Sequence, residues 1–263
     1  MTKKFLFSIL ITLILSACSS IEKREYTNQQ GQKVIEDWFN ESSLKSKTIF
    51  YSTDSSDYVS ISYYENGELK DSAHYVNKQL DGLRLYYDQA SELFHSETYS
   101  NGIMDGAHKA VYKNNFTSFE GYWVNGYKVG EWQFHYPDGR PITYEFYDSL
   151  GRVLYFRKYN EKGEVMDVNG SAIIGISART DLKPGAVVVN LIVANPPGGE
   201  VSVKILDNRS NVLCNKKVDA VYANCSFVLS EAENKKVKIQ VNILDLKSGH
   251  EEEHVQDFEF IKQ

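Results

Sequence analysis

The sequence predicts an all-β protein, in which a long antiparallel β-meander of about 24-residue repeats is followed by a smaller β-sandwich. Gly82, Gly106 and Gly130 follow one another at intervals of 24 residues, with aromatic and Asn residues at matching offsets. A fixed period in this range is typical of repeat architectures. Asn-Gly and Asp-Gly pairs separate short segments of alternating polarity, which is the pattern of β-hairpins. After residue 166 aromatic residues become rare, and short Val- and Ile-rich segments alternate with turn signals.

The repeat region is expected to cover residues 31–166, in units of two short strands each. Type I′ hairpin turns need φ > 0 at both central residues, which Asn and Gly accept at little cost. The glycines predicted to form the repeat turns are Gly67, Gly82, Gly102, Gly106, Gly126, Gly130 and Gly139. Ser91 and Asn115 stand where such a glycine would fall, so we expect looser turns there.

The aromatic residues of the repeats are interpreted as mostly structural. One unit cannot bury its aromatic side chains alone, whereas stacked units can. The alternative is that these residues form an exposed recognition stripe.

The repeated residues resemble a known family. The segments Tyr99–Gly106 and Trp123–Gly130 each combine an aromatic residue, Asn-Gly and a second glycine at fixed offsets. This pattern resembles the bacterial variant of the MORN repeat over about half of the chain. Bacterial proteins of that kind are often labelled as antitoxins or membrane-associated scaffolds, and the resemblance implies a role of this sort without implying any active site.

Residues 167–263 are predicted to form an immunoglobulin-like β-sandwich. Seven short strands separated by turn signals over about 95 residues are typical of that architecture. The expected strands are 172–178, 186–194, 200–206, 212–218, 221–229, 237–246 and 254–261. The Cys–Trp–Cys spacing of antibody domains is absent, so the prediction concerns the architecture alone.

Cys214 and Cys225 are candidates for a disulfide. An exported protein meets oxidising conditions, in which a disulfide forms and persists. The two residues fall in consecutive predicted strands. A hairpin turn near Asp219-Ala220 would place them opposite each other, with Cα atoms about 4.5 Å apart. We therefore expect the bond to link one local hairpin rather than two sheets; two buried free thiols are the alternative.

The N-terminus has the layout of a bacterial lipoprotein signal. Lys3 and Lys4 precede an apolar run that is shorter than the roughly 20 residues of a membrane span. The following Leu15-Ser16-Ala17-Cys18 resembles a lipobox, in which the cysteine is acylated and becomes the mature N-terminus. We expect a signal peptide over residues 1–17, lipidation at Cys18 and a lipidated tether over residues 18–30; an ordinary signal peptide with an incidental cysteine is the alternative.

These features predict a location in the bacterial cell envelope. Ser19 follows the cysteine, which resembles sorting to the outer membrane. Without the two signal lysines the chain has 27 basic and 35 acidic residues, a net charge of −8. This acidity argues against a nucleic-acid partner, because phosphate binding needs clustered Lys and Arg. The lipid itself is expected to hold the protein at the membrane.

No catalytic motif, metal site or cofactor site is predicted. His250-Glu251-Glu252-Glu253-His254 matches a zinc-protease pattern, but that chemistry needs a helix, and in a strand the two imidazoles would be about 13 Å apart. The remaining histidines of the repeats are interpreted as sheet-surface residues: His74, His95, His108 and His135.

The sequence therefore favours a non-catalytic protein-binding or scaffold module. The expected partners are the membrane, through the N-terminal lipid, and an envelope or secreted protein. Two alternatives stay open: an immunity or antitoxin-type protein that neutralises a toxin, and an envelope hydrolase.

Overall fold

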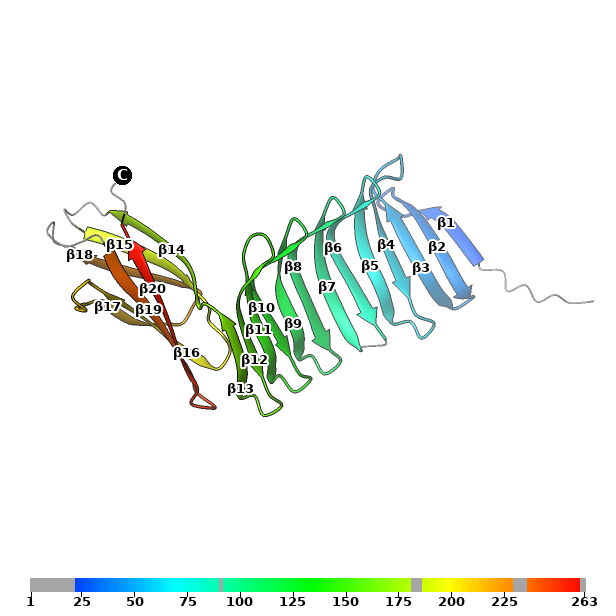
Figure 1. Cartoon of the computed structure of the whole chain (residues 1–263). Coiled ribbons are helices and arrows are strands. Elements are labelled where there is room, and N and C mark those ends of the chain that lie inside the picture. Colours follow the sequence, from blue (N-terminus) through cyan, green and yellow to red (C-terminus); the bar gives the residue numbers. More distant parts are fainter. Residues whose placement is uncertain (1–21, 90–91, 181–185, 229–235, 261–263) are drawn as a thin grey trace, which may run out of the picture.

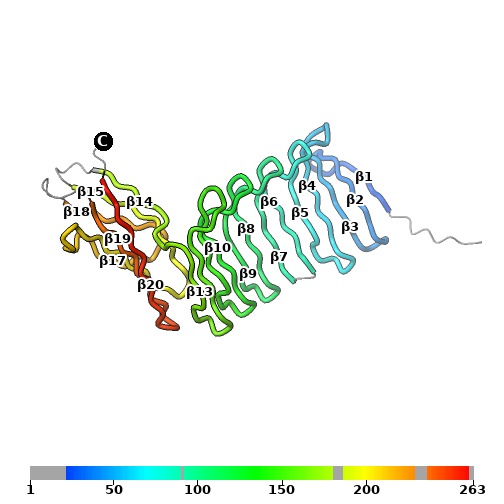
Figure 2. The backbone as a smooth tube through the Cα atoms, viewed as in Figure 1, coloured from blue at the N-terminus to red at the C-terminus, as the bar shows by residue number. Residues whose placement is uncertain are grey.

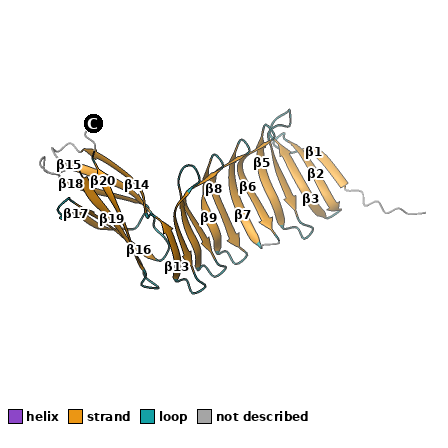
Figure 3. Cartoon of the chain, in the orientation of Figure 1, coloured by secondary structure: helices purple, strands orange, loops and turns teal. Residues whose placement is uncertain are grey.

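The computed structural model describes residues 22–89, 92–180, 186–228 and 236–260, and this part of the chain contains twenty strands and no helix (Figures 1 and 3). The strands form one antiparallel sheet of 13 strands and two smaller sheets of three and four strands. The predicted all-β fold class, with a long meander followed by smaller sheets, is confirmed.

The long sheet is a meander in which every strand pairs with its neighbours along the chain (Figure 2). Alternate strands β5, β7, β9, β11 and β13 begin at residues 69, 93, 117, 141 and 165, which reproduces the 24-residue period. The strands of this sheet are β1 (Glu22–Thr27), β2 (Lys33–Asn40), β3 (Ser43–Phe50), β4 (Tyr58–Tyr63), β5 (Leu69–Val76), β6 (Gln79–Asp88), β7 (Leu93–Ser100), β8 (Ile103–Tyr112), β9 (Thr117–Val124), β10 (Tyr127–His135), β11 (Pro141–Tyr147), β12 (Val153–Tyr159) and β13 (Val165–Gly170).

Two-residue turns connect the strands at one end of each hairpin; we call each of the two rows of strand ends an edge of the sheet. Asn77-Lys78, Asn101-Gly102 and Asn125-Gly126 all have φ between 48° and 80°, as type I′ turns require. The turn amides also bond to the preceding unit: Gly102 N donates to Leu80 O at 2.7 Å, and Gly126 N donates to Met104 O at 2.9 Å. The turns are therefore connected to one another along the edge.

Longer turns lie along the other edge. Gly67, Asn115 and Gly139 have φ of 84°, 68° and 82°, and the amide of each donates to the carbonyl three residues earlier at 2.8–2.9 Å. Asn115 thus forms the same turn as the two glycines, since Asn tolerates the left-handed region. The looser turn expected there is wrong; the one expected at Ser91 lies outside the described residues.

Gly82, Gly106 and Gly130 are not turn glycines, so that part of the prediction is wrong. They lie inside β6, β8 and β10, with φ of 93°, 128° and 64°. At each position the register shifts; in β8 three consecutive residues centred on Gly106 face Thr98 alone. These are β-bulges whose glycines have positive φ, as the turn glycines do, so the sequence around these glycines does not distinguish a bulge from a turn.

We expect Gly106→Ala to lower the free energy of unfolding by about 1–3 kcal/mol. An added Cβ would lie 2.7 Å from Thr98 Cβ, at a φ of +128° that side chains rarely adopt. Gly67→Asn is the matched control, because Gly67 has φ +84° with no atom within 4 Å of an added Cβ. It should change stability by less than about 0.5 kcal/mol. Urea unfolding measures both values, and equal losses would contradict the bulge assignment.

The boundaries of the meander differ from the expected ones. The predicted tether over residues 18–30 is wrong from Glu22 onward, because β1 pairs with β2 along its whole length. All residues of β1 are exposed, so the strand lacks the alternation of apolar and polar residues that identifies a half-buried strand in a sequence. At the other end β13 continues the sheet to Gly170 instead of residue 166. Its two valines, Val165 and Val168, pack on the core that the sheet shares with the sandwich.

All seven strands of the predicted sandwich are present. One sheet has the order β14-β15-β18 and the other β17-β16-β19-β20. This is the immunoglobulin strand order, except that the fourth strand, β17, lies in the second sheet rather than the first. The strands are β14 (Ile173–Thr180), β15 (Ala186–Val193), β16 (Gly199–Leu206), β17 (Val212–Val218), β18 (Tyr222–Val228), β19 (Lys236–Asp245) and β20 (Glu251–Glu259).

A disulfide joins Cys214 and Cys225, as predicted, but it links the two sheets instead of one hairpin. Cys214 lies on β17 in the four-stranded sheet and Cys225 on β18 in the three-stranded sheet. Their Cα atoms are 6.0 Å apart. The expected hairpin does not form because β17 pairs with β16 and β18 pairs with β15, so residues 219–221 cross between the sheets.

Candidate functional site

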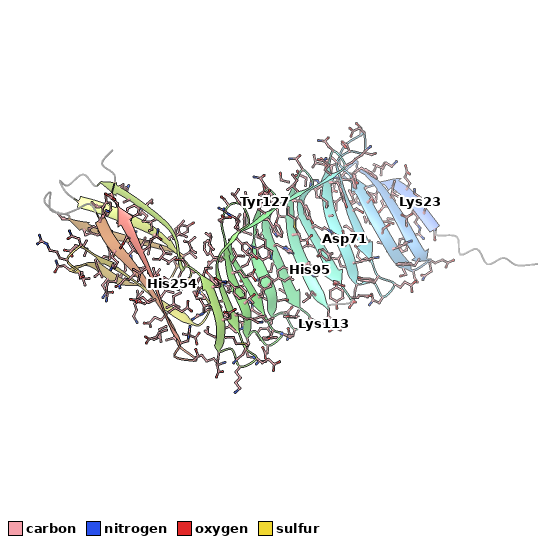
Figure 4. The ribbon with its side chains drawn as sticks, in the orientation of Figure 1. Lys23, Asp71, His95, Lys113, Tyr127 and His254 are labelled. Atoms are coloured by element: carbon pink, nitrogen blue, oxygen red, sulfur yellow. A yellow bond between two sulfur atoms is a disulfide. The ribbon has the colours of Figure 1, made fainter. Side chains whose placement is uncertain are left out.

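The two faces of the long sheet have different compositions. Tyr86, His95, Ala110, Phe119 and Phe134 are successive cross-strand partners from β6 to β10, so they share one side of the sheet. We call this side the aromatic face and the other side the opposite face. Figure 4 shows His95 in the middle of the sheet and Tyr127 at the edge with the two-residue turns.

Side chains on the aromatic face shield one another from solvent by packing against neighbours on the same face. Trp132 is 1% exposed, and its ring lies over Gly121, where an added Cβ would be 2.2 Å from the ring. Lys128 places its Nζ 4.3 Å from the centroid of Trp132, 5.2 Å from that of Phe134 and 5.4 Å from that of Tyr147. The absence of a side chain at Gly121 lets the large ring lie flat on the backbone, which is a known use of glycine in strands.

Glu97 is the buried centre of a polar cluster on this face. Its side chain accepts hydrogen bonds from the hydroxyls of Tyr86, at 3.1 Å, and Tyr99, at 2.9 Å. Arg84 Nη1 lies 3.6 Å from one carboxylate oxygen, and His108 Nε2 lies 3.4 Å from the other. Burial and the neighbouring Glu97 charge raise the pKa of Tyr86 to about 12, so this phenol stays a donor. The buried carboxylate therefore has several polar partners in place of bulk water.

Two histidines of this cluster were predicted to be sheet-surface residues, and His95 is instead buried, with 9% exposure. Among the described residues, neither His95 Nδ1 nor His108 Nε2 has a hydrogen-bond partner. Burial lowers the pKa of both rings, which keeps them neutral near pH 7. His95, Glu97 and His108 together bring ligand atoms within 4.8 Å of one another, although the sequence predicted no metal site. The signal in the sequence was His95-x-Glu97, which places both side chains on one face of a strand.

An apolar patch lies on the opposite face, near the edge with the two-residue turns. Its members come from β6, β8, β9 and β10 and are between 38% and 52% exposed: Leu83, Ile103, Tyr122, Val124 and Tyr127. The residues between them are small, since Ala107 pairs with Tyr122 and Ser100 pairs with Ile103. We call these five exposed residues the apolar patch.

The sandwich packs on the opposite face beyond this patch, at β11–β13. Tyr144, Tyr155 and Tyr159 belong to the same buried core cluster as the inner residues of the sandwich. The amide of Asn195 donates to the Tyr144 hydroxyl at 2.9 Å, and Tyr159 donates to Pro197 O at 3.0 Å. The junction between the two parts is therefore packed and hydrogen-bonded.

A buried cation stands at the centre of this junction. Arg157 on β12 is fully buried, with Nη2 2.9 Å from Glu252 and Nη1 3.7 Å from Asp245. Tyr155 donates to Glu252 at 2.7 Å, and His254 Nε2 lies 3.1 Å from the same carboxylate oxygen. Burial opposes the charge on Glu252, but the hydrogen bonds from His254 and Tyr155 and the Arg157 charge outweigh it and lower the pKa of Glu252.

We expect Arg157→Met to lower the free energy of unfolding at pH 7 by about 3–5 kcal/mol, because it leaves two carboxylates buried without their cation. Arg152→Met is the matched control. Arg152 pairs with Asp148, but its side chain is 73% exposed, so its loss should cost less than about 1 kcal/mol. Urea unfolding of both variants measures the difference, and equal costs would contradict a central role for Arg157.

The pH dependence gives a second measurement on the same pair. Since the pKa of Glu252 is lowered from 4.5 in the folded protein, its stabilisation is present above about pH 4.5 and is lost as the pH falls further. In Arg157→Met the unpaired carboxylates are protonated at low pH. The stability gap between this variant and the parent protein should therefore shrink from pH 7 to pH 4, whereas the gap for Arg152→Met should stay small throughout.

The other residues singled out from the sequence lie apart from these clusters. Cys18 and the signal peptide lie outside the described residues. His250 directly precedes β20 and His254 lies in it, so the His-Glu-x-x-His segment is not on a helix. Along the described ranges, no helix is long and apolar enough to cross a membrane.

Comparison with known proteins adds no relative. No protein-family model matches the chain, and no curated protein is significantly similar to it. The MORN resemblance and the lipobox therefore stay predictions that depend on the quoted residues.

Proposed function

We propose that this protein is a lipid-anchored component of the bacterial cell envelope that binds another protein, without catalysis, through the opposite face of its repeat sheet. The observation that carries the proposal is the apolar patch. Exposed apolar side chains that are contiguous, rather than scattered, mark interaction sites on soluble proteins. Tyrosine and aliphatic side chains with small residues between them are well suited to the centre of a protein interface.

The position of the patch also supports this proposal. The opposite face is already used for packing at β11–β13, where the sandwich covers it. The apolar patch adjoins that region, since Tyr127 lies against Gly151 in the β11–β12 turn. A partner seated on the patch would thus meet a face whose neighbouring part is held rigid by the buried junction.

The proposed anchor supports a partner within the envelope. Cys18 precedes Glu22, the first residue of β1, by four residues. At about 3.5 Å per residue, lipid at Cys18 would hold β1 within about 14 Å of the membrane surface. The sheet would then present the patch to proteins of the same membrane or of the adjoining compartment.

In-cell photo-crosslinking tests the binding surface. A photoreactive phenylalanine derivative at position 127, in the apolar patch, is expected to capture one dominant partner protein. The same derivative at position 222 is the matched control, because Tyr222 is also an exposed tyrosine, at 75%, but lies on the sandwich. Mass spectrometry identifies the captured protein; a secreted toxin would show that the binding serves neutralisation.

Capture of the same scattered envelope proteins from both positions would overturn the proposed surface. A dominant partner captured only from position 222 would move the binding site to the sandwich.

Cys18→Ser tests the anchor separately. Without the thiol no acyl chain can be attached, so we expect loss of incorporated labelled palmitate. Cys214→Ser/Cys225→Ser is the matched control and should keep both the label and the membrane association. Unchanged palmitate incorporation in Cys18→Ser would contradict lipidation at this residue.

A further inference from the structure

The polar cluster at the centre of the aromatic face has the composition of a metal site. His95 and Glu97 are two residues apart on β7, and His108 on β8 is the cross-strand partner of Glu97. His95 Nδ1 and His108 Nε2 are buried without hydrogen-bond partners among the described residues. Ligand atoms from the three residues lie within 4.8 Å of one another. Buried polar atoms are normally satisfied, so two details need a reason: His95 Nδ1 has no partner in the described part of the chain, and His108 Nε2 lies 3.4 Å from a carboxylate oxygen without a regular hydrogen bond.

We propose that His95, Glu97 and His108 bind one zinc ion. Two imidazoles and one carboxylate are a common ligand set for zinc, with water as the fourth ligand. The 3.4 Å between Glu97 Oε1 and His108 Nε2 suits two ligands of one tetrahedral ion, for which bonds of about 2.0–2.1 Å place ligand atoms roughly 3.3 Å apart. All three residues lie on paired strands, which are more rigid supports than loops.

The nearby Arg84 cation is paired with a different carboxylate, so it does not occupy the side of Glu97 that faces His108. Arg84 is held by Asp71 through two hydrogen bonds of 2.8 and 2.6 Å, and its Nη1 lies 3.6 Å from Glu97 Oε2. Oε2 also accepts from Tyr99, so this oxygen is already engaged on the side away from His108. Oε1 faces His108 and accepts from the Tyr86 hydroxyl at 3.1 Å, which leaves a lone pair of this oxygen for the metal.

Zinc binding requires one proton to move within His108. The indole Nε1–H of Trp123 donates to His108 Nδ1 at 3.1 Å, so the neutral ring carries its proton on Nε2. When Nε2 binds zinc it gives up that proton, and Nδ1 takes one up, which leaves the ring neutral. Nδ1 can then no longer accept, so the Trp123 indole must turn away. The hydrogen bond from Trp123 thus competes with the metal.

Titration of the purified, chelator-treated protein with zinc tests this proposal. We expect one equivalent to bind, with a change in tryptophan fluorescence and, with cobalt as a probe, absorption typical of a tetrahedral site. Glu97→Gln and His95→Asn should each weaken binding by at least tenfold. Trp123→Phe removes the competing hydrogen bond and should bind zinc several-fold more tightly. His250→Gln, a change at an exposed histidine of the sandwich, is the control and should bind like the parent protein.

Three results would overturn the proposal: no binding at 100 μM zinc, binding that Glu97→Gln and His95→Asn leave unchanged, or an equal loss in His250→Gln. Far-UV circular dichroism checks that each variant folds. If Glu97→Gln does not fold, His95→Asn and His108→Asn decide the outcome, since each removes a metal ligand and keeps Glu97 in place.

Discussion

The repeat sheet has to stabilise a wide surface without a second layer over most of its strands. A single antiparallel sheet is stable only if one of its faces is buried. From β6 to β10 this protein meets that constraint on one face by packing side chains against their lateral neighbours, with Trp132 lying on Gly121 and Lys128 extending over three rings. The central bulges also shape this face, because they bend the strands and increase their local twist.

The opposite face is consequently free for other uses, and the chain uses it in two ways. At β11–β13 it becomes one wall of a core shared with the sandwich, with Arg157 compensating two carboxylates from another part of the chain. At β6–β10 it carries apolar side chains that nothing in the described part of the chain covers. Such a division separates the residues that hold the fold together from those that are available to a partner.

The sequence predicted the turns and strands that are determined by the residues within them. Asn-Gly at 101–102 and 125–126 predicts a type I′ turn because both residues accept positive φ, and the seven sandwich strands follow from β-branched runs between turn signals. Gly106 was misplaced because a bulge and a turn make the same demand on the backbone. The sequence did not predict that the disulfide links two sheets, because a short connection between two cysteines is compatible with a hairpin or with a crossing between sheets. The histidine cluster depended on the bulge as well: in a regular hairpin with this turn His108 would face His95, whereas the two extra residues of the bulge bring it opposite Glu97.

The 24-residue period makes the length of the molecule adjustable in fixed increments. Each unit contributes two strands, and neighbouring strands are about 4.8 Å apart, so one duplication or deletion would change the sheet by about 10 Å. The thirteen strands now separate the first strand from the sandwich by up to about 58 Å. Since the junction involves only the last three strands and the proposed anchor precedes the first, units could be gained or lost between them without altering either end. If Cys18 carries the proposed lipid, the number of repeats would set the distance between the sandwich and the membrane.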